Sequence, residues 1–301
     1  RVRSIAQFLV VGLFLFLVVL DFGCKSADDG IPSRIAIDNI DLNIDPANGN
    51  EIHQIKGVQV FANQELIGNF ELPCKIPIDK LGKVQIDIFP LVFINGSSSN
   101  LSLYTPLEGY RDTLNLAAGI TQTIVPSFNH RAATVVRWIE DFEDNNSTLI
   151  PILPSPFPGD TTEITTRPFD LDGKFSGPSK VYRFCFENSD TAKYFDAGSF
   201  LEYTDLPTNG SAVFFEFDIK TDLPVQLALR RKNPTTSELV PYMVVNPTGG
   251  KWKRFYVNLV YELTNQPANT SIRIFFDVNK PANSVAGREI LFDNLRLSYL
   301  K

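Results

Sequence analysis

The chain has 301 residues, which is more than one small module needs and is typical of two domains. Hydrophobic residues make up 44% and charged residues 21%, so the chain can bury proper cores and global disorder is excluded. The formal net charge of -6 argues against a nucleic-acid-binding protein, which needs a basic face for phosphates. Only two histidines and one methionine are present, whereas 20 prolines, 18 glycines and 24 phenylalanines favour short strands joined by many turns.

The first residues have the pattern of an export signal. Arg1 and Arg3 form a short basic start, and an apolar run from Ile5 to Leu20 follows. This run is slightly shorter than the ~20 residues that a helix needs to cross a bilayer. The order of basic, apolar and small residues instead predicts a secretory signal peptide over residues 1–23.

Cys24 follows Gly23 directly after the apolar run. The pair resembles a bacterial lipobox, although Asp21 stands where that family normally has Leu. The resemblance implies that the Cys24 thiol is diacylated and becomes the new N-terminus. Two or three acyl chains, at about 0.8 kcal/mol per buried CH₂, anchor a protein stably. The alternative is that Cys24 is an ordinary residue behind an uncleaved anchor.

A polar segment follows this cysteine. Residues 24–32 predict a flexible acidic tether between the anchor and the first folded domain. Within it, residues 25–30 resemble the acidic export tags that follow the lipidated cysteine in surface lipoproteins of Bacteroidota. The resemblance implies a lipid-anchored outer-membrane protein displayed at the cell surface.

Residues 33–137 predict a small β-sandwich, because apolar and polar side chains alternate in short runs separated by turn residues. Residues 57–63 and 66–73 predict a hairpin, and residues 83–90 place three aliphatic side chains on one face. The hairpin pattern V-x-V-F-x-N-x-x-x-I-G-x-F-x-L-P resembles PEGA-like and carboxypeptidase-regulatory-like modules, in which Gly68 would supply a tight conformation between strands. Such modules are common in bacterial envelope lipoproteins, and the resemblance implies no catalysis.

The second domain is predicted over residues 138–301. Residues 139–180 form a linking segment, in which Pro151, Pro154, Pro156, Pro158 and Gly159 cannot lie inside central strands. Alternating rows of apolar residues follow it. The start F-E-D at residues 142–144, a W-x-x-F-x-V-x-L strand and the ending F-D-N-L-R-L resemble jelly-roll carbohydrate-binding and galactose-binding-like domains. The resemblance implies a C-terminal jelly-roll β-sandwich, which makes the whole chain all-β.

One face of this second sandwich is a candidate ligand-binding surface. If the apolar residues of each strand point inward, alternation directs their polar and aromatic neighbours outward. Aromatic planes and Arg or Gln side chains suit a glycan, and Trp, Tyr and Arg are equally enriched in protein interfaces. A third reading is that a loop or the first domain covers the face. The candidate ligand-binding residues are Trp252, Arg254, Tyr256, Arg230, Gln226 and Arg273. They form one surface only if strands 226–230 and 252–258 are neighbours.

A structural calcium ion is the second candidate ligand. Jelly-roll glycan binders often hold Ca²⁺ between the entry strand and the last strand, and hard oxygen ligands are what this ion needs. The resemblance implies that Glu140, Asp141, Glu143 and Asp293 are its ligands. The alternative is a solvated acidic loop together with an aspartate that turns the final strand. No other cofactor is expected.

Catalytic motifs are missing from the sequence. It has no nucleophile elbow, P-loop, dinucleotide fingerprint or zinc-ligand spacing. His53 and His130 have the surroundings of surface or turn residues, and Cys74 and Cys185 those of structural residues. We therefore expect no enzyme activity.

The sequence as a whole predicts a non-catalytic outer-membrane lipoprotein that acts as a binding or scaffolding subunit of an envelope complex. The alternative is a polysaccharide-binding surface lipoprotein that uses the aromatic face of the jelly roll. The expected partners are the membrane, through the N-terminal lipid, and either an outer-membrane protein or a glycan. A nucleic-acid partner is not expected.

Overall fold

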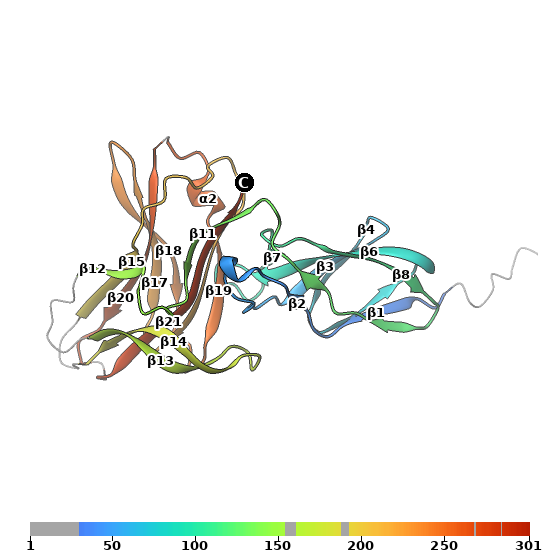
Figure 1. The fold of residues 1–301 in the computed structure, drawn as a ribbon, viewed down its shortest axis with the longest axis horizontal. Helices are drawn as coiled ribbons and strands as arrows, with labels where there is room; N and C mark the ends of the chain where they lie inside the picture. The colour runs from blue at the N-terminus through green and yellow to red at the C-terminus, as the bar shows by residue number, and fades with distance from the viewer. Residues whose placement is uncertain (1–29, 154–160, 188–192, 268, 284) are drawn as a thin grey trace, which may run out of the picture.

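The computed structural model describes residues 30–153, 161–187, 193–267, 269–283 and 285–301. Two β-sandwiches lie along the long axis of the molecule, and the predicted all-β class is confirmed (Figure 1). The predicted signal peptide, Cys24 and the tether up to residue 29 lie outside the described residues. Within the described part of the chain, no helix is long and apolar enough to span a bilayer.

The N-terminal sandwich consists of a five-stranded sheet, in which β3 and β6 are central, packed against the smaller sheets β5-β1-β9 and β10-β2. Its core is one cluster of aliphatic side chains from both layers. The elements are β1 (Ser33–Ile37), β2 (Asp41–Leu42), the 3-10 turn η1 (Pro46–Asn48), β3 (Gly57–Ala62), β4 (Glu65–Glu71), β5 (Cys74–Ile78), β6 (Gly82–Phe93), β7 (Leu101–Leu103), β8 (Tyr110–Leu116), β9 (Thr121–Thr123) and β10 (Ser127–Phe128).

The predicted hairpin is confirmed as β3 and β4, which pair in antiparallel register. The aliphatic row of β6 is also confirmed, because Val84, Ile86 and Ile88 are all buried in the N-terminal core. Gly68 does not form the turn between the strands. It lies inside β4, opposite Val60, and the turn is made by two other residues.

The C-terminal sandwich has a six-stranded sheet β13-β14-β21-β16-β19, in which β11 also pairs with β21, and a five-stranded sheet β12-β15-β20-β17-β18. This is the jelly-roll sandwich that the sequence predicts. The elements are β11 (Thr134–Glu140), β12 (Leu149–Leu153), β13 (Thr161–Asp170), β14 (Ser176–Phe186), β15 (Lys193–Ser199), β16 (Val213–Thr221), β17 (Val225–Lys232), β18 (Ser237–Val245), β19 (Lys253–Asn258), α2 (Val260–Leu263), β20 (Ser271–Lys280) and β21 (Arg288–Leu300).

The two sheets bury a phenylalanine-rich core between them. Phe215 and Phe217 of the six-stranded sheet contact Phe276 of the five-stranded sheet, with ring centroids 6.0 and 5.0 Å apart. β11 pairs with β21 from Thr134 onward, so the chain enters the second domain four residues before the predicted start at residue 138.

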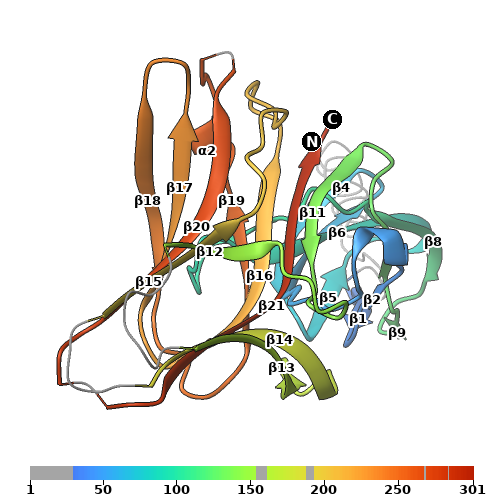
Figure 2. The ribbon, with the colours of Figure 1, turned by 60° about the vertical axis from the view of Figure 1, so that its left-hand side comes forward.

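Each sheet of the C-terminal sandwich has one face turned away from this core. On the six-stranded sheet, β19 and β21 lie beside the N-terminal domain (Figure 1). We call this contact the seam. On the five-stranded sheet, the strands β17, β18 and β20 lie on the side away from the N-terminal domain (Figure 2).

Candidate functional site

The seam contains two of the six predicted ligand-binding residues. Arg254 and Tyr256 lie on β19 and point away from the C-terminal core, as alternation predicts, but they are only 6% and 3% exposed. Tyr256 belongs to the core cluster of the N-terminal domain. Its hydroxyl accepts a hydrogen bond from the Gln54 N–H at 2.9 Å. The prediction that these two residues are exposed to a ligand is wrong, because the first domain covers them.

Trp252 is also buried, at 5% exposed, but in a different place. It precedes β19 and packs on Phe169, with ring centroids 4.9 Å apart, and its indole N–H donates to the Pro168 carbonyl at 3.1 Å. The small apolar cluster beneath the end of β13 therefore accounts for this tryptophan. Its predicted exposure is wrong as well.

The seam holds a network of buried charges, which we call the seam network: Glu216, Asp218, Arg254, Arg296 and Tyr104. Arg254 pairs with Glu216 at 2.9 Å and with Asp218 at 3.1 Å. Arg296 pairs with Glu216 at 2.8 Å, and the Tyr104 hydroxyl of the N-terminal domain donates to the same carboxylate. Two guanidinium groups thus balance two carboxylates, as buried charges require.

The two carboxyl groups of the seam network have pKa values shifted in opposite directions. Burial favours the neutral form of Glu216, but the Arg296 and Arg254 charges outweigh it and hold its pKa at about 2. Burial dominates at Asp218 and raises its pKa to about 6, against the attraction of Arg254. Its members come from both domains, so the seam network joins the two sandwiches.

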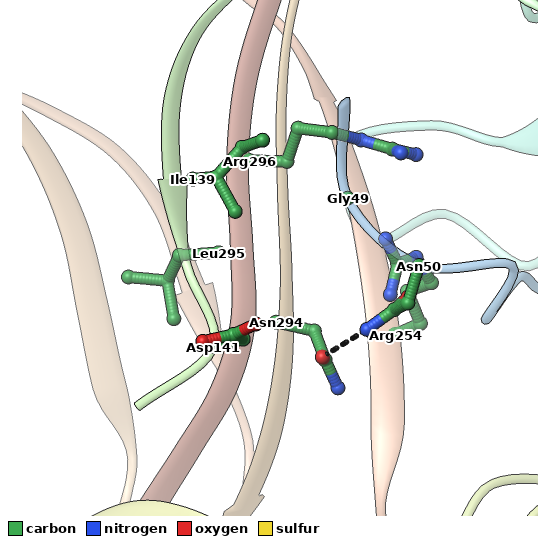
Figure 3. Close-up of a pocket in the computed structure, with 8 residues that line it drawn as sticks. All are labelled: Gly49, Asn50, Ile139, Asp141, Arg254, Asn294, Leu295 and Arg296. Carbon is green, nitrogen blue, oxygen red and sulfur yellow. Dashed lines mark hydrogen bonds between the residues drawn. The ribbon is translucent and has the colours of Figure 1, made fainter. Parts of the chain in front are cut away.

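A small hollow at the edge of the seam is enclosed by both domains (Figure 3). Asn50 of the N-terminal domain donates a hydrogen bond to the Asn294 side chain at 2.5 Å across it. Gly49 approaches the Arg296 side chain so closely that a Cβ atom would lie 3.3 Å from the guanidinium nitrogen. Because these contacts close the hollow, it offers little room for a ligand.

The other three predicted ligand-binding residues lie together on the five-stranded sheet. We call its solvent-facing side the outer face and define it by Gln226, Arg230, Arg273, Phe275 and Asp277. β17 and β20 are neighbours, and Gln226 stands opposite Asp277, with Arg230 opposite Arg273. β19 belongs to the other sheet, so the predicted neighbourhood of strands 226–230 and 252–258 is absent.

Two arginines cover one aromatic ring at the centre of the outer face. The Arg230 guanidinium lies 4.5 Å from the Phe275 ring centroid, and that of Arg273 lies 5.6 Å from it. Phe275 is only 1% exposed, whereas both arginines are half-buried. The Arg273 Nε–H also donates to the Ser199 carbonyl at 2.5 Å. Stacking and this hydrogen bond fix two planar donor groups at the surface.

Carboxylates follow the arginines along the outer face. Asp277 stands opposite Asp196 of β15, and the Tyr194 hydroxyl donates to Asp196 at 3.0 Å. Burial, followed by the charge of Asp196, raises the pKa of Asp277, and the Arg230 charge opposes this. Hydrogen-bond donors and largely buried acceptors thus occupy neighbouring positions on β15, β17 and β20.

Exposed apolar side chains border this polar centre. Phe200, immediately after β15, is 62% exposed, while Leu239 and Val244 of β18 are 47% and 52% exposed. Tyr194, Asp196 and Phe200 were not among the predicted ligand-binding residues. The alternation Lys-Tyr-Phe-Asp-Ala-Gly-Ser in β15 was the available signal, because it places Tyr194 and Asp196 opposite the buried Phe195.

Each of the predicted calcium ligands forms hydrogen bonds with other groups of the chain. Glu140 is buried, and its carboxylate accepts from the Phe142 N–H at 2.8 Å and from the Thr148 N–H and hydroxyl at 2.5 and 2.6 Å. Asp141 is exposed and accepts from the Glu143 N–H at 3.2 Å.

Glu143 and Asp293 share one hydrogen-bond donor. The Ser179 hydroxyl lies 3.0 Å from an oxygen of each carboxyl group, and Glu143 also accepts from the Lys180 N–H at 2.8 Å. Within the described ranges, no three acidic, histidine or cysteine side chains form a metal-binding group. Calcium binding by these four residues, which the jelly-roll resemblance implies, therefore stays a prediction.

The histidines are less exposed than the sequence suggests. His53 is 7% exposed, and burial lowers its pKa to about 3, with Lys174, Arg254 and Lys56 adding to the effect. Burial likewise lowers the pKa of His130 to about 4. Both are neutral near pH 7. Cys74 and Cys185 are free thiols, and burial raises the pKa of each.

No family model and no curated protein matches the sequence. Several solved structures resemble part of the chain. The family 11 carbohydrate-binding module from Clostridium thermocellum in complex with a β-1,3-1,4-mixed-linked tetrasaccharide is 16% identical, with 55% of this chain and 94% of that chain covered and a TM-score of 0.33. TmCBM61 in complex with β-1,4-galactotriose is 16% identical, with 52% and 92% covered and a TM-score of 0.29.

The enzymatically active domain of tailspike protein 4 from bacteriophage CBA120 is also similar. It is 13% identical, with 56% of this chain covered and a TM-score of 0.32. The matched region spans only 20% of the tailspike chain. The fold and the two faces of the jelly roll define a two-domain all-β protein in which a small sandwich carries a jelly roll.

Proposed function

We propose that this protein binds polysaccharide on the outer face of its jelly roll and performs no catalysis. The observation that carries the proposal is the arrangement of Arg230 and Arg273 over Phe275, beside Asp277, on a side of the sandwich that the first domain leaves uncovered. Fixed planar donors next to acceptors suit the paired hydroxyl groups of sugar rings.

Two aromatic residues extend this surface. Tyr194 is 37% exposed and Phe200 is 62% exposed, at opposite ends of β15. Aromatic rings combine apolar area with low conformational freedom, so they provide flat contacts for the apolar faces of sugars. A polar centre with an aromatic group at either end fits an extended chain better than a single small molecule.

The anchor belongs to the same proposal. The sequence of residues 1–30 supports a signal peptide, lipidation at Cys24 and display on the outer membrane of a Bacteroidota-like cell. The PEGA-like resemblance of residues 57–90 supports a spacer role for the N-terminal sandwich. In this arrangement the jelly roll presents bound glycan away from the membrane.

A second candidate function is docking onto a protein of an envelope complex. The exposed Phe200, Leu239 and Val244 at the border of the outer face favour it, because neighbouring exposed apolar side chains are typical of protein interfaces. Pull-down from detergent-solubilised membranes tests this alternative. Recovery of the chain only as a monomer contradicts it.

Affinity electrophoresis in gels that contain neutral or uronic-acid polysaccharides tests the glycan proposal. The parent chain should be retarded by at least one polymer. Arg230→Ala should weaken retention about 10-fold or more, because it removes a charged hydrogen-bond donor worth about 1.5–3 kcal/mol. The matched control is Arg137→Ala, since Arg137 lies in the other sheet and pairs with the exposed Asp205. Unchanged retention of Arg230→Ala, or no retention of the parent chain by any polymer, overturns the proposal.

A further inference from the structure

Four exposed aliphatic side chains gather at one end of the N-terminal sandwich. Ile31, Leu66, Leu81 and Ile120 are 50%, 54%, 52% and 54% exposed. They come from four separate segments of the chain, and we call them the apolar end. Isolated exposed apolar residues are ordinary, but a group drawn from several loops to one place indicates a contact surface.

Strand register places these segments together. Ser33 pairs with Ile78, and the Arg34 N–H donates to the Ile120 carbonyl at 2.9 Å, so the chain entry at Ile31 lies beside the loops that carry Leu81 and Ile120. Gly119 confirms this closeness, because a Cβ atom on it would lie 3.4 Å from the Ile31 side chain.

Two further contacts complete the apolar end. Gly82 pairs with Leu116, which brings the loop before β6 against the loop after β8. Lys80 forms an ion pair of 2.6 Å with Glu65, the neighbour of Leu66 in the β3–β4 hairpin. All four aliphatic residues therefore occupy the same end of the domain.

Turns usually carry polar residues, but each of these two turns also carries an exposed aliphatic residue. Residues 79–82 read Asp-Lys-Leu-Gly, and residues 117–120 read Ala-Ala-Gly-Ile. Gly82 and Gly119 have φ values of +77° and +72°, so each glycine serves the turn itself. Leu81 and Ile120 are neither required by the turn conformation nor buried in the core. A contact outside the domain would account for their apolar side chains.

The position of the apolar end identifies that contact. It lies at the extremity of the molecule remote from the jelly roll, where the described chain begins (Figure 1). Cys24 precedes Ile31 by seven residues, which span at most about 25 Å when fully extended. A lipid attached at Cys24 therefore holds this end, and not the jelly roll, within reach of the bilayer.

We propose that the apolar end rests on the lipid surface and inserts its aliphatic side chains among the headgroups. The proposal rests on the anchor proposed above and is independent of glycan binding. Apolar side chains that enter the boundary between headgroups and acyl chains add to the affinity of an acyl anchor. Two exposed basic residues lie near this end, and their charges suit lipid phosphate groups. They are Arg34, near the start of β1, and Lys83, near the start of β6. The jelly roll then stands away from the membrane with its outer face accessible.

Quenching of tryptophan fluorescence by brominated lipids tests this orientation. Leu81→Trp and Ile120→Trp are made in the full-length, acylated chain, which is reconstituted into phosphatidylcholine vesicles brominated in the acyl chains. The matched control is Leu239→Trp, at a position 47% exposed on the jelly roll. The native Trp138 and Trp252 are 7% and 5% exposed and contribute the same background to every variant. Both variants at the apolar end should be quenched at least about two-fold more than the control, since interfacial side chains reach the acyl boundary.

Equal quenching of all three variants overturns the proposal, as does failure of the chain to remain with the vesicles on flotation. Retention by polysaccharide is measured on the same preparations. Loss of membrane quenching with glycan retention intact refutes only the membrane contact. Intact quenching without glycan retention refutes only the proposed function.

Discussion

Asp293 lies in β21 at the border of the seam network, and its side chain is 1% exposed. Its oxygens accept hydrogen bonds from the Ser179 hydroxyl at 3.0 Å and the Asn294 N–H at 2.8 Å. Burial, followed by the negative charge of Asp218, outweighs these bonds and raises the pKa of Asp293 to about 8, with Glu143 adding to the effect. The folded chain therefore keeps a proton on Asp293 that the unfolded chain releases above pH 4.

This raised pKa fixes the sign of a pH effect. The stability contributed by the protonated Asp293 is complete below the ordinary pKa near 4 and is lost as the pH rises toward 8. Asp293→Asn mimics the neutral acid at every pH. The difference in unfolding free energy, variant minus parent, should therefore grow as the pH rises from 5 to 8, by at most about 1.4 kcal/mol per pH unit. Urea titrations at several pH values measure this difference. A constant difference across that range contradicts the assigned pKa.

Single positions were predicted from alternation, and alternation is local. It correctly directed Arg254 and Tyr256 away from the core of their own sandwich. Whether a side chain that leaves one core reaches solvent depends on what packs there, and the covering residues, such as Gln54 and Tyr104, lie 152 or more positions away in the chain. Nothing in residues 252–258 encodes that contact.

The β3–β4 hairpin shows the same limit at the scale of an element. The strands were predicted, but Gly68 was assigned to the turn that Asn63 and Gln64 make. These residues have φ values of +49° and +68°, which is the left-handed conformation of a two-residue type I′ turn. Asparagine tolerates this conformation well, whereas glutamine lacks the short side chain that compensates for it.

Replacement of the strained residue should stabilise the hairpin. Gln64→Gly supplies the Asn-Gly pair that this turn favours, and we expect the free energy of unfolding to rise by about 0.5–1 kcal/mol. The control is the same substitution inside a strand. Gln59→Gly lies in β3, where glycine is unfavourable, and it should lower the free energy of unfolding by a similar amount. Chemical denaturation of both variants measures the pair. Equal destabilisation by the two substitutions contradicts the assigned turn.

Strand positions were easier to predict than strand partners. The apolar rows from Val213 to Ile219 and from Val225 to Leu229 are buried as expected. The alternation that predicts their burial is visible within a few consecutive residues. The order of strands within a sheet is set by packing between distant segments. The sequence therefore left open whether strands 226–230 and 252–258 are neighbours, and they are not, because β19 pairs with β16. Three of the six predicted ligand-binding residues do lie together, because β17 and β20 pair: Gln226, Arg230 and Arg273.

At the scale of the whole molecule, the two sandwiches keep separate cores, and side chains of the jelly roll reach into the N-terminal one. Phe214 and Tyr256 of the jelly roll are members of the N-terminal core, and Tyr104 packs on both rings at centroid distances of 5.2 and 5.1 Å. The backbone of Asn95 also donates to the Tyr256 carbonyl at 2.9 Å. These contacts join the two sandwiches. In the proposed arrangement, the N-terminal domain would therefore hold the outer face in a fixed direction relative to an anchored end.

The seam network is the part of this joint most sensitive to a single change. Arg254→Met leaves Asp218 buried without a guanidinium partner and removes one of the two that serve Glu216. Truncating one member of a buried charge network costs about 3–5 kcal/mol. Calorimetry should show one transition for the parent chain and two for Arg254→Met, as each sandwich then unfolds on its own.

The matched control is Arg137→Met, which breaks the surface ion pair with Asp205 and should cost at most about 1 kcal/mol without dividing the transition. Similar unfolding curves for the two variants would show that the apolar contacts of Phe214 and Tyr256 couple the domains without the charges. Such a result would assign the seam network to fixing the angle between the sandwiches, because a buried ion pair can specify geometry while adding little stability.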